Sequence, residues 1–365
     1  MAKKRAVDSY ILFATLALVI GGFLIFLSAS LGLLAREGAE FADIATSQLL
    51  LGIVGGLIAL FVTSNIPYRF WKQYSFYIFI LACVLCLLVF TPLGIELNGA
   101  RSWLDFGFTT FQPAEALKIG YVLYLATWLS QRRKANIPFL VRIGPFVAIT
   151  SVVALLLLLQ PDMGTFLVIG SAGGAMFFAS GARFKDMGIL ALAGVIALSG
   201  FIVTHPHALD RIQTFLDPAK DPQGAGYQIQ KSLIAVGSGQ VLGRGFGQSI
   251  QKFTTLPEPT SDSIFAVFAE EFGFVGSVVL VLGFLTFALR SLFIAARTPD
   301  LFSGLVVVGI AILISVQSFL NIGAMLAVFP LSGLPLIFIS HGGSALAMAL
   351  ASVGIMLQIS RYART

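Results

Sequence analysis

Long apolar stretches constrain the fold of this chain more than any other feature. A bilayer core of about 30 Å requires about 20 apolar residues in one helix. Of the 365 residues, 57% are hydrophobic and only 11% are charged, too few charges to cover a soluble surface. Apolar runs of suitable length lie at 10–34, 45–66, 73–91, 114–130, 140–159, 164–180, 187–204, 264–295, 301–320 and 335–359.

These runs predict an all-α integral membrane protein. We expect a polytopic bundle of about ten transmembrane helices, forming a single membrane domain over 1–365 with one large extracytoplasmic loop. A count of nine is the alternative, because the run 114–130 carries Glu115 and Lys118 and the run 164–180 is short. The first run exceeds a signal-peptide core, so we interpret it as an uncleaved helix.

Lysine and arginine predict the orientation, because they accumulate in short cytoplasmic connections. With the N-terminus inside, the inner segments hold Lys3, Lys4, Arg5, Arg69, Lys72, Arg132, Arg133, Lys134, Arg142, Arg183, Lys185, Arg297, Arg361 and Arg364. The short outer segments hold only Arg36 and Arg101. Both termini are therefore predicted to be cytoplasmic. The net charge of +6 fits this inner face and contact with anionic lipid headgroups, and it calls for no nucleic acid.

The polar clusters lie mainly on the predicted outer side. The longest is 205–263, between the seventh and eighth runs, and it includes an amphipathic stretch at 227–236 that suits a membrane surface. Its glycines, from Gly237 to Gly247, match neither a dinucleotide fingerprint nor a P-loop. Residues 35–44 and 66–71 are expected to be short loops.

Two pairs of residues of metal-binding types are not expected to bind a metal. Cys83 and Cys86 lie inside the third run with no companion pair, so we interpret them as small apolar side chains. His205 and His207 have no other histidine nearby and are not expected to make a metal site.

Asp262 is the first candidate for chemistry. The polar stretch 256–263, with Pro257 and Pro259, runs directly into an apolar helix, and Ser261, Asp262 or Ser263 could cap it. A carboxylate in lipid costs about 2.5–3.5 kcal/mol, so it must face protein, water or ligand.

Glu270 and Glu271 follow about two turns inside this helix. If one of them shares a cavity with Asp262, the helical geometry favours Glu270.

Other candidates accompany Asp262. Glu115 and Lys118 are spaced i, i+3 and can pair, either as a buried structural ion pair or as the lining of an outward cavity. Arg101 suits an interface anchor or phosphate oxygens. Asp162 lies near the interface and could cap the sixth helix.

The stretch 321–344 is rich in glycine and proline, and it contains Ser340 and His341. Non-helical backbone at membrane depth is tolerated only beside protein or a watery cavity. We therefore expect a broken helix that borders such a cavity.

Several motifs in this order resemble the SEDS family, the RodA/FtsW/SpoVE group of cell-wall proteins. They are NGARSW, FQPAE with Lys118, QPDMGT, FLDP with GAGYQ, GSG with GRGFGQS, LPEPTSD with FAEEFG, and NIG followed by GLP and SHGGS. The chain differs from the commonest family pattern at Ser263, His341 and Ala345. Its short termini are closer to RodA, whereas its GRGFGQSIQK segment is closer to FtsW and SpoVE.

The resemblance implies a peptidoglycan glycosyltransferase that polymerises lipid II on the outer face of the bacterial cytoplasmic membrane, beside a class B penicillin-binding protein. It places the essential aspartate at Asp262 and sensitive residues at Glu115 and Lys118. We expect a role in elongation, with division or sporulation as the alternative. A lipid II flippase and a non-catalytic scaffold are the competing functions.

The reaction needs a base and cations. We assign Asp262 as the base for the incoming sugar hydroxyl. Lys118 and Arg101 are candidates for the leaving diphosphate, with Glu115 orienting Lys118, and a divalent cation, Mg or Mn, could serve the same end.

Overall fold

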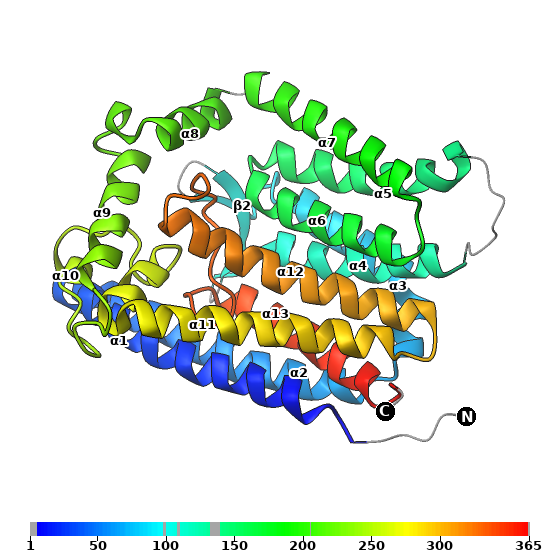
Figure 1. Cartoon of the computed structure of the whole chain (residues 1–365), viewed down its shortest axis with the longest axis horizontal. Coiled ribbons are helices and arrows are strands. Elements are labelled where there is room, and N and C mark those ends of the chain that lie inside the picture. Colours follow the sequence, from blue (N-terminus) through cyan, green and yellow to red (C-terminus); the bar gives the residue numbers. More distant parts are fainter. Residues whose placement is uncertain (1–5, 98–99, 108–109, 132–138, 205, 364–365) are drawn as a thin grey trace.

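The structure, a computed structural model, describes residues 6–97, 100–107, 110–131, 139–204 and 206–363. Helices dominate it (Figure 1). They are α1 (Ser9–Ser47), the π-helical η1 (Gln48–Gly55), α2 (Gly56–Asn65), α3 (Tyr68–Leu88), α4 (Pro113–Gln131), α5 (Phe139–Leu159), α6 (Met163–Ala179), α7 (Phe184–Thr204), α8 (Pro206–Leu216), the 3-10 turn η2 (Pro218–Lys220), α9 (Ala225–Ser238), α10 (Gln251–Thr254), α11 (Ile264–Ala296), α12 (Leu301–Met325) and α13 (Gly343–Ser360).

The predicted membrane bundle is confirmed. Within the described residues, seven helical stretches are long and apolar enough to cross a membrane, and two shorter apolar stretches lie in α5 and α6. The more polar α4 coincides with the remaining expected run. Cys83 and Cys86 are buried and unpaired in α3, as the sequence indicated.

Two connections differ from expectation. The outer loop predicted at 35–44 is helical, because α1 runs to Ser47 and continues through η1 into α2. This stretch holds good helix formers and no proline, so little in it ends a helix. The inner loop predicted at 66–71 is also shorter, since α3 begins at Tyr68.

A small antiparallel sheet was not predicted. Its strands β1 (Gly94–Leu97), β2 (Ala100–Asp105) and β3 (Thr110–Phe111) are arranged in the order β1-β2-β3. Strands this short carry little hydrophobic periodicity, so their sequence gives a weak signal.

Some residues used for the sequence predictions lie outside the described part of the chain. They are Lys3, Lys4, Arg5, Arg132, Arg133, Lys134, His205 and Arg364. Of the side chains of Arg36, Arg142 and His207 nothing is described either.

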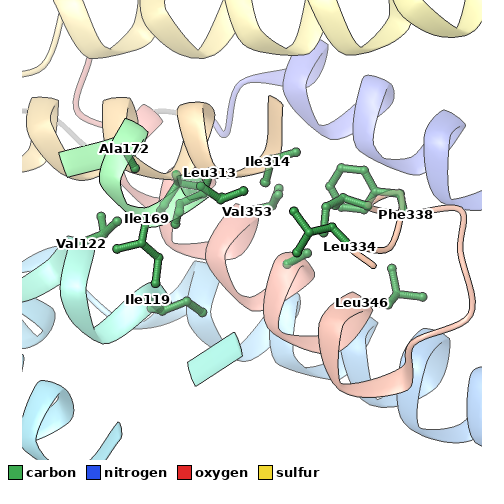
Figure 2. Close-up of a cluster of buried hydrophobic side chains, with 14 of the residues drawn as sticks. Ile119, Val122, Ile169, Ala172, Leu313, Ile314, Leu334, Phe338, Leu346 and Val353 are labelled. Atoms are coloured by element: carbon green, nitrogen blue, oxygen red, sulfur yellow. The ribbon is translucent and has the colours of Figure 1, made fainter. Parts of the chain in front are cut away.

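The centre of the molecule is formed by α12 and α13. In their apolar stretches 78% and 83% of the residues are buried, against 6% in α7, which lies at the edge of the bundle in Figure 1. Side chains from α4, α6, α12, α13 and the connection before α13 meet in one apolar cluster (Figure 2). The start of α1 and the end of α13 lie at the opposite end of the bundle from α9 and α10 (Figure 1).

The connection 326–342, here called the return segment, is not helical although much of it is buried. Leu336, Phe338 and Ile339 are each at most 3% exposed. The expected broken helix is therefore present, since α13 begins only at Gly343. Its backbone polar groups are bonded by protein, as in the hydrogen bond of 2.8 Å from the Leu336 amide to Ser340 Oγ.

Helix α11 is interrupted at Gly273, which has a φ of 66°. The glycine-rich stretch 239–247 packs against this break, and the amides of Arg244 and Gly245 donate to the carbonyls of Glu270 and Glu271 at 3.0 and 2.9 Å. These glycines thus allow two backbones to meet, a role that needs no bound phosphate.

We predict that Gly273→Ala destabilises the protein by about 1–3 kcal/mol, because φ is positive and the new methyl group would meet the amide nitrogen of Gly243. Thermal unfolding in detergent measures the effect. Gly170→Ala is the matched control, since a Cβ there has no neighbour within 4 Å. Equal unfolding temperatures for the two variants would contradict the prediction.

Candidate active site

Asp262 lies at the entrance to α11, and its carboxylate is not used to cap the helix. The N-cap residue is Ser263, and it makes no side-chain capping bond. Asp262 Oδ1 instead accepts a hydrogen bond of 3.1 Å from Gln228 Nε2 of α9. The Asp262 side chain remains partly exposed, so it is available to a ligand.

The surroundings of Asp262 make its carboxyl group a stronger base than usual. Burial is the main cause, and it raises the pKa of Asp262 to about 6. The bond from Gln228 acts in the opposite direction, whereas the charge of Glu258 raises the pKa further. A carboxylate of this pKa can accept a proton near neutral pH.

Two segments, α12 and the return segment, hold the backbone around Asp262. Asn321 Nδ2 of α12 donates to the Asp262 carbonyl at 2.7 Å. In the return segment, Ser340 Oγ donates to the Ser261 carbonyl at 2.6 Å, and the His341 amide donates to the Thr260 carbonyl at 2.7 Å. The structure thus brings Ser340 and His341, both singled out from the sequence, next to the Asp262 loop.

The His341 side chain points elsewhere. Its ring stacks on Phe26 of α1 with 6.0 Å between centroids. Burial lowers the pKa of His341, which favours the neutral imidazole, and its buried Nε2 has no hydrogen-bond partner among the described residues.

Glu115 and Lys118 form the predicted pair on α4. Lys118 Nζ lies 2.7 Å from Glu115 Oε2, and both side chains are 6% exposed. Lys118 Nζ also donates to Gln317 Oε1 of α12 at 2.7 Å. All three residues line a small pocket of about 20 Å³, which is room for about one water molecule. The pair is thus buried in the bundle interior.

Arg101 and Asp162 have local partners. The exposed Arg101 donates to the carbonyls of Thr91 and Gly94 at 2.7 and 3.3 Å, and so holds the hairpin. Asp162 Oδ1 accepts from the Thr165 amide at 2.9 Å, which confirms the predicted cap of α6. Among the described residues, no hydrogen bond or ion pair joins Arg101 or Asp162 to Asp262.

Glu270 is fully buried, and its carboxylate is hydrogen-bonded to the segment that leads into α10. Its carboxylate accepts from Ser249 Oγ at 2.6 Å and from the amides of Ile250 and Gln251 at 3.1 and 3.2 Å. Ser238 Oγ at the end of α9 also donates to it at 3.1 Å, and in the part of the chain that the structure describes no hydrogen bond or ion pair joins Glu270 to Asp262.

Glu271 makes a second buried link. Lys252 Nζ lies 2.6 Å from Glu271 Oε1, and both side chains are 0% exposed. Ser28 Oγ of α1 donates to the same carboxylate at 2.6 Å. This clasp of Ser28, Lys252 and Glu271 fixes α1, α10 and α11 to one another.

Sequence reasoning missed several of these residues. Gln228 and Lys252 lie in polar loop sequence, where nothing marks them individually. Gln317 and Asn321 gave a usable signal, because they are polar residues four apart in an otherwise apolar helix.

Fold and site together define a polytopic membrane protein with a partly exposed, weakly acidic aspartate at one end of its bundle. Residues 8–365 match the sequence model of the FtsW/RodA/SpoVE family, described as "Cell cycle protein". The chain belongs to this family, the SEDS family that its motifs resemble.

Relatives by sequence include stage V sporulation protein E of Bacillus subtilis, 37% identical over 99% of both chains. A probable peptidoglycan glycosyltransferase FtsW of Thiomicrospira cyclica is 38% identical over 99% of this chain and 93% of that one.

Two solved structures share the fold. A chain of a peptidoglycan synthase complex that coordinates polymerization and crosslinking is 29% identical, with a TM-score of 0.78 over 98% of both chains. Thermus thermophilus RodA is 28% identical, with a TM-score of 0.72 over 99% of this chain and 98% of that one. The two sequence relatives thus carry the names SpoVE and FtsW, and one of the two solved structures is a RodA.

We predict that Lys252→Met destabilises the fold by about 3–5 kcal/mol, because it leaves Glu271 as a buried charge without its partner. The measurement is thermal unfolding in detergent. Lys185→Met, which removes an exposed lysine, is expected to unfold like the native chain. An unchanged unfolding temperature in Lys252→Met would show that the clasp carries no stability.

Proposed function

We propose that this chain is a peptidoglycan glycosyltransferase that polymerises lipid II into glycan strands. The observation that carries the proposal is the Asp262 carboxylate, partly exposed at the entrance to α11 and raised in pKa to about 6. Membership of the FtsW/RodA/SpoVE family and relatives named as peptidoglycan glycosyltransferases support it.

In this mechanism Asp262 is the general base. Its carboxylate takes the proton of a sugar hydroxyl on one lipid-linked disaccharide while that oxygen attacks the anomeric carbon of another. The bond from this carbon to the lipid diphosphate breaks, and the diphosphate leaves with the electron pair. Gln228 holds Asp262 Oδ1, so the second carboxylate oxygen can face the hydroxyl.

The departing diphosphate needs positive charge. Lys118 and Arg101 stay our candidates, although in the ligand-free protein Lys118 is bonded to Glu115 and Gln317. In the described residues, no three His, Cys, Asp or Glu side chains gather into a metal site. Mg or Mn would thus depend mainly on diphosphate oxygens, and we assign it no step.

The proposed setting is the bacterial cytoplasmic membrane, with both termini inside and Asp262 facing outward. The positive charge of the inner connections supports this orientation. Similarity to FtsW and SpoVE favours division or sporulation over elongation. A class B penicillin-binding protein is the proposed partner, and the likeness to a chain of a peptidoglycan synthase complex supports an assembly of this kind.

We expect the purified native chain to form glycan strands from lipid II in detergent without a partner, and Asp262→Asn to lower the rate by about 10²–10⁴-fold. The amide keeps the shape of the side chain but cannot accept the proton. Asp162→Asn is the control, since asparagine caps a helix nearly as well as aspartate. Undiminished polymerisation by Asp262→Asn would remove the base assignment, and lipid II translocation into vesicles without polymerisation would favour a flippase.

The same assignment predicts the pH dependence of the rate. Because the base acts only when deprotonated, kcat should fall as the pH drops through about 6, by about tenfold per pH unit below it. Initial rates between about pH 5 and pH 8 measure this. A rate that stays constant down to pH 5 would be incompatible with Asp262 as the base.

A further inference from the structure

Two buried amides on α12 hold the return segment in place. Gln317 Nε2 donates to the Pro335 carbonyl at 3.1 Å, and Asn321 Nδ2 donates to the Leu334 carbonyl at 2.8 Å. Gln317 and Asn321 are one helical turn apart and 1% exposed each. Two neighbouring carbonyls of the return segment are thus bonded by two side chains of one helix face.

The other hydrogen bonds of these amides lead to the two halves of the candidate site. Gln317 Oε1 accepts from Lys118 Nζ at 2.7 Å. Asn321 Nδ2 also donates to the Asp262 carbonyl at 2.7 Å. A continuous path therefore runs from Lys118 through Gln317, the return segment and Asn321 to Asp262.

The chemistry of the path explains why amides stand here. An amide side chain accepts and donates at once, so Gln317 can bind an ammonium group and a carbonyl together. The carbonyls of Leu334 and Pro335 belong to buried non-helical backbone, where an unpaired carbonyl is destabilising. Ser318, which lies between Gln317 and Asn321 in sequence, donates to the Ile314 carbonyl within α12 instead.

We propose that Gln317 and Asn321 are positioning residues that set the placement of Asp262 relative to Lys118. This inference rests on the proposed glycosyltransferase function. Ser340 and His341 of the return segment bond the two residues just before Asp262. A shift of the return segment therefore moves the Asp262 loop through both bonds.

The Gln317 variants test whether the whole hydrogen-bond path matters or only the contact between Gln317 and Lys118. Gln317→Glu keeps an acceptor for Lys118 but cannot donate to the Pro335 carbonyl, whereas Gln317→Leu loses both bonds. We expect kcat for lipid II polymerisation to fall by about 10–100-fold in both variants, with KM little changed, because a small misplacement has this effect. Ser318→Ala, a buried polar change on the same helix, should keep native kcat.

The Asn321→Leu variant tests the second half of the path. Besides burial, the groups acting on the Asp262 carboxyl are Gln228 from α9, Glu258 from its own loop, the neighbouring Ser263 and its own backbone. Without Asn321 the loop loosens and Asp262 becomes more hydrated, so the acid limb of the pH–rate profile should move below about 6. The profile is normalised to its maximum, so partial unfolding does not move its midpoint. Asn321→Ser replaces Asn321→Leu if the latter does not fold.

The outcomes distinguish this inference from the proposed function. Native activity in Gln317→Glu with loss in Gln317→Leu would show that only the Lys118 contact matters and would overturn the coupling. An unmoved acid limb in the Asn321 variant would overturn it as well. If the native chain itself made no strands from lipid II, the proposed function would fail first.

Discussion

Buried backbone that is not helical must find its hydrogen bonds within the protein, and this constraint organises the centre of the molecule. The return segment 326–342 enters the bundle as irregular chain, so side chains of neighbouring helices must bond its carbonyls. Gln48 of η1, which donates to the Ser340 carbonyl at 3.2 Å, joins the α12 amides in this task. These three buried amides thus lie where the backbone departs from helical geometry.

The same arrangement explains why one carboxylate stays available while the others do not. Glu270 and Glu271 are each bonded to several donors, Glu115 is paired with Lys118, and all three residues are at most 5% exposed. The Asp262 side chain accepts only at Oδ1, from Gln228 and Ser263, so within the described residues its second carboxylate oxygen has no hydrogen bond. Stability and reactivity are therefore divided between different acids of the same chain.

The sequence predicts what depends on near neighbours. The apolar runs, the Glu115–Lys118 pair and the Asp162 cap all follow from spacing within a few residues, and the structure contains them. Contacts with Asp262 come from residues 34 and 59 positions away, Gln228 and Asn321, so no local pattern specifies them. Glu270 shows what a local pattern cannot predict. Helical periodicity gives the direction of its side chain, but not which loop residues donate hydrogen bonds to its carboxylate.

The break in α11 has a further consequence for which sequences the fold accepts. Gly243 and Gly273 face each other so closely that a side-chain atom on either would overlap the main chain beside the other. Their φ values of 81° and 66° also disfavour any residue with a Cβ. A larger residue at one position cannot be accommodated by a smaller one at the other, because neither has volume to give up. Glycine is therefore required at both positions together, and no pair of compensating substitutions can replace the two glycines.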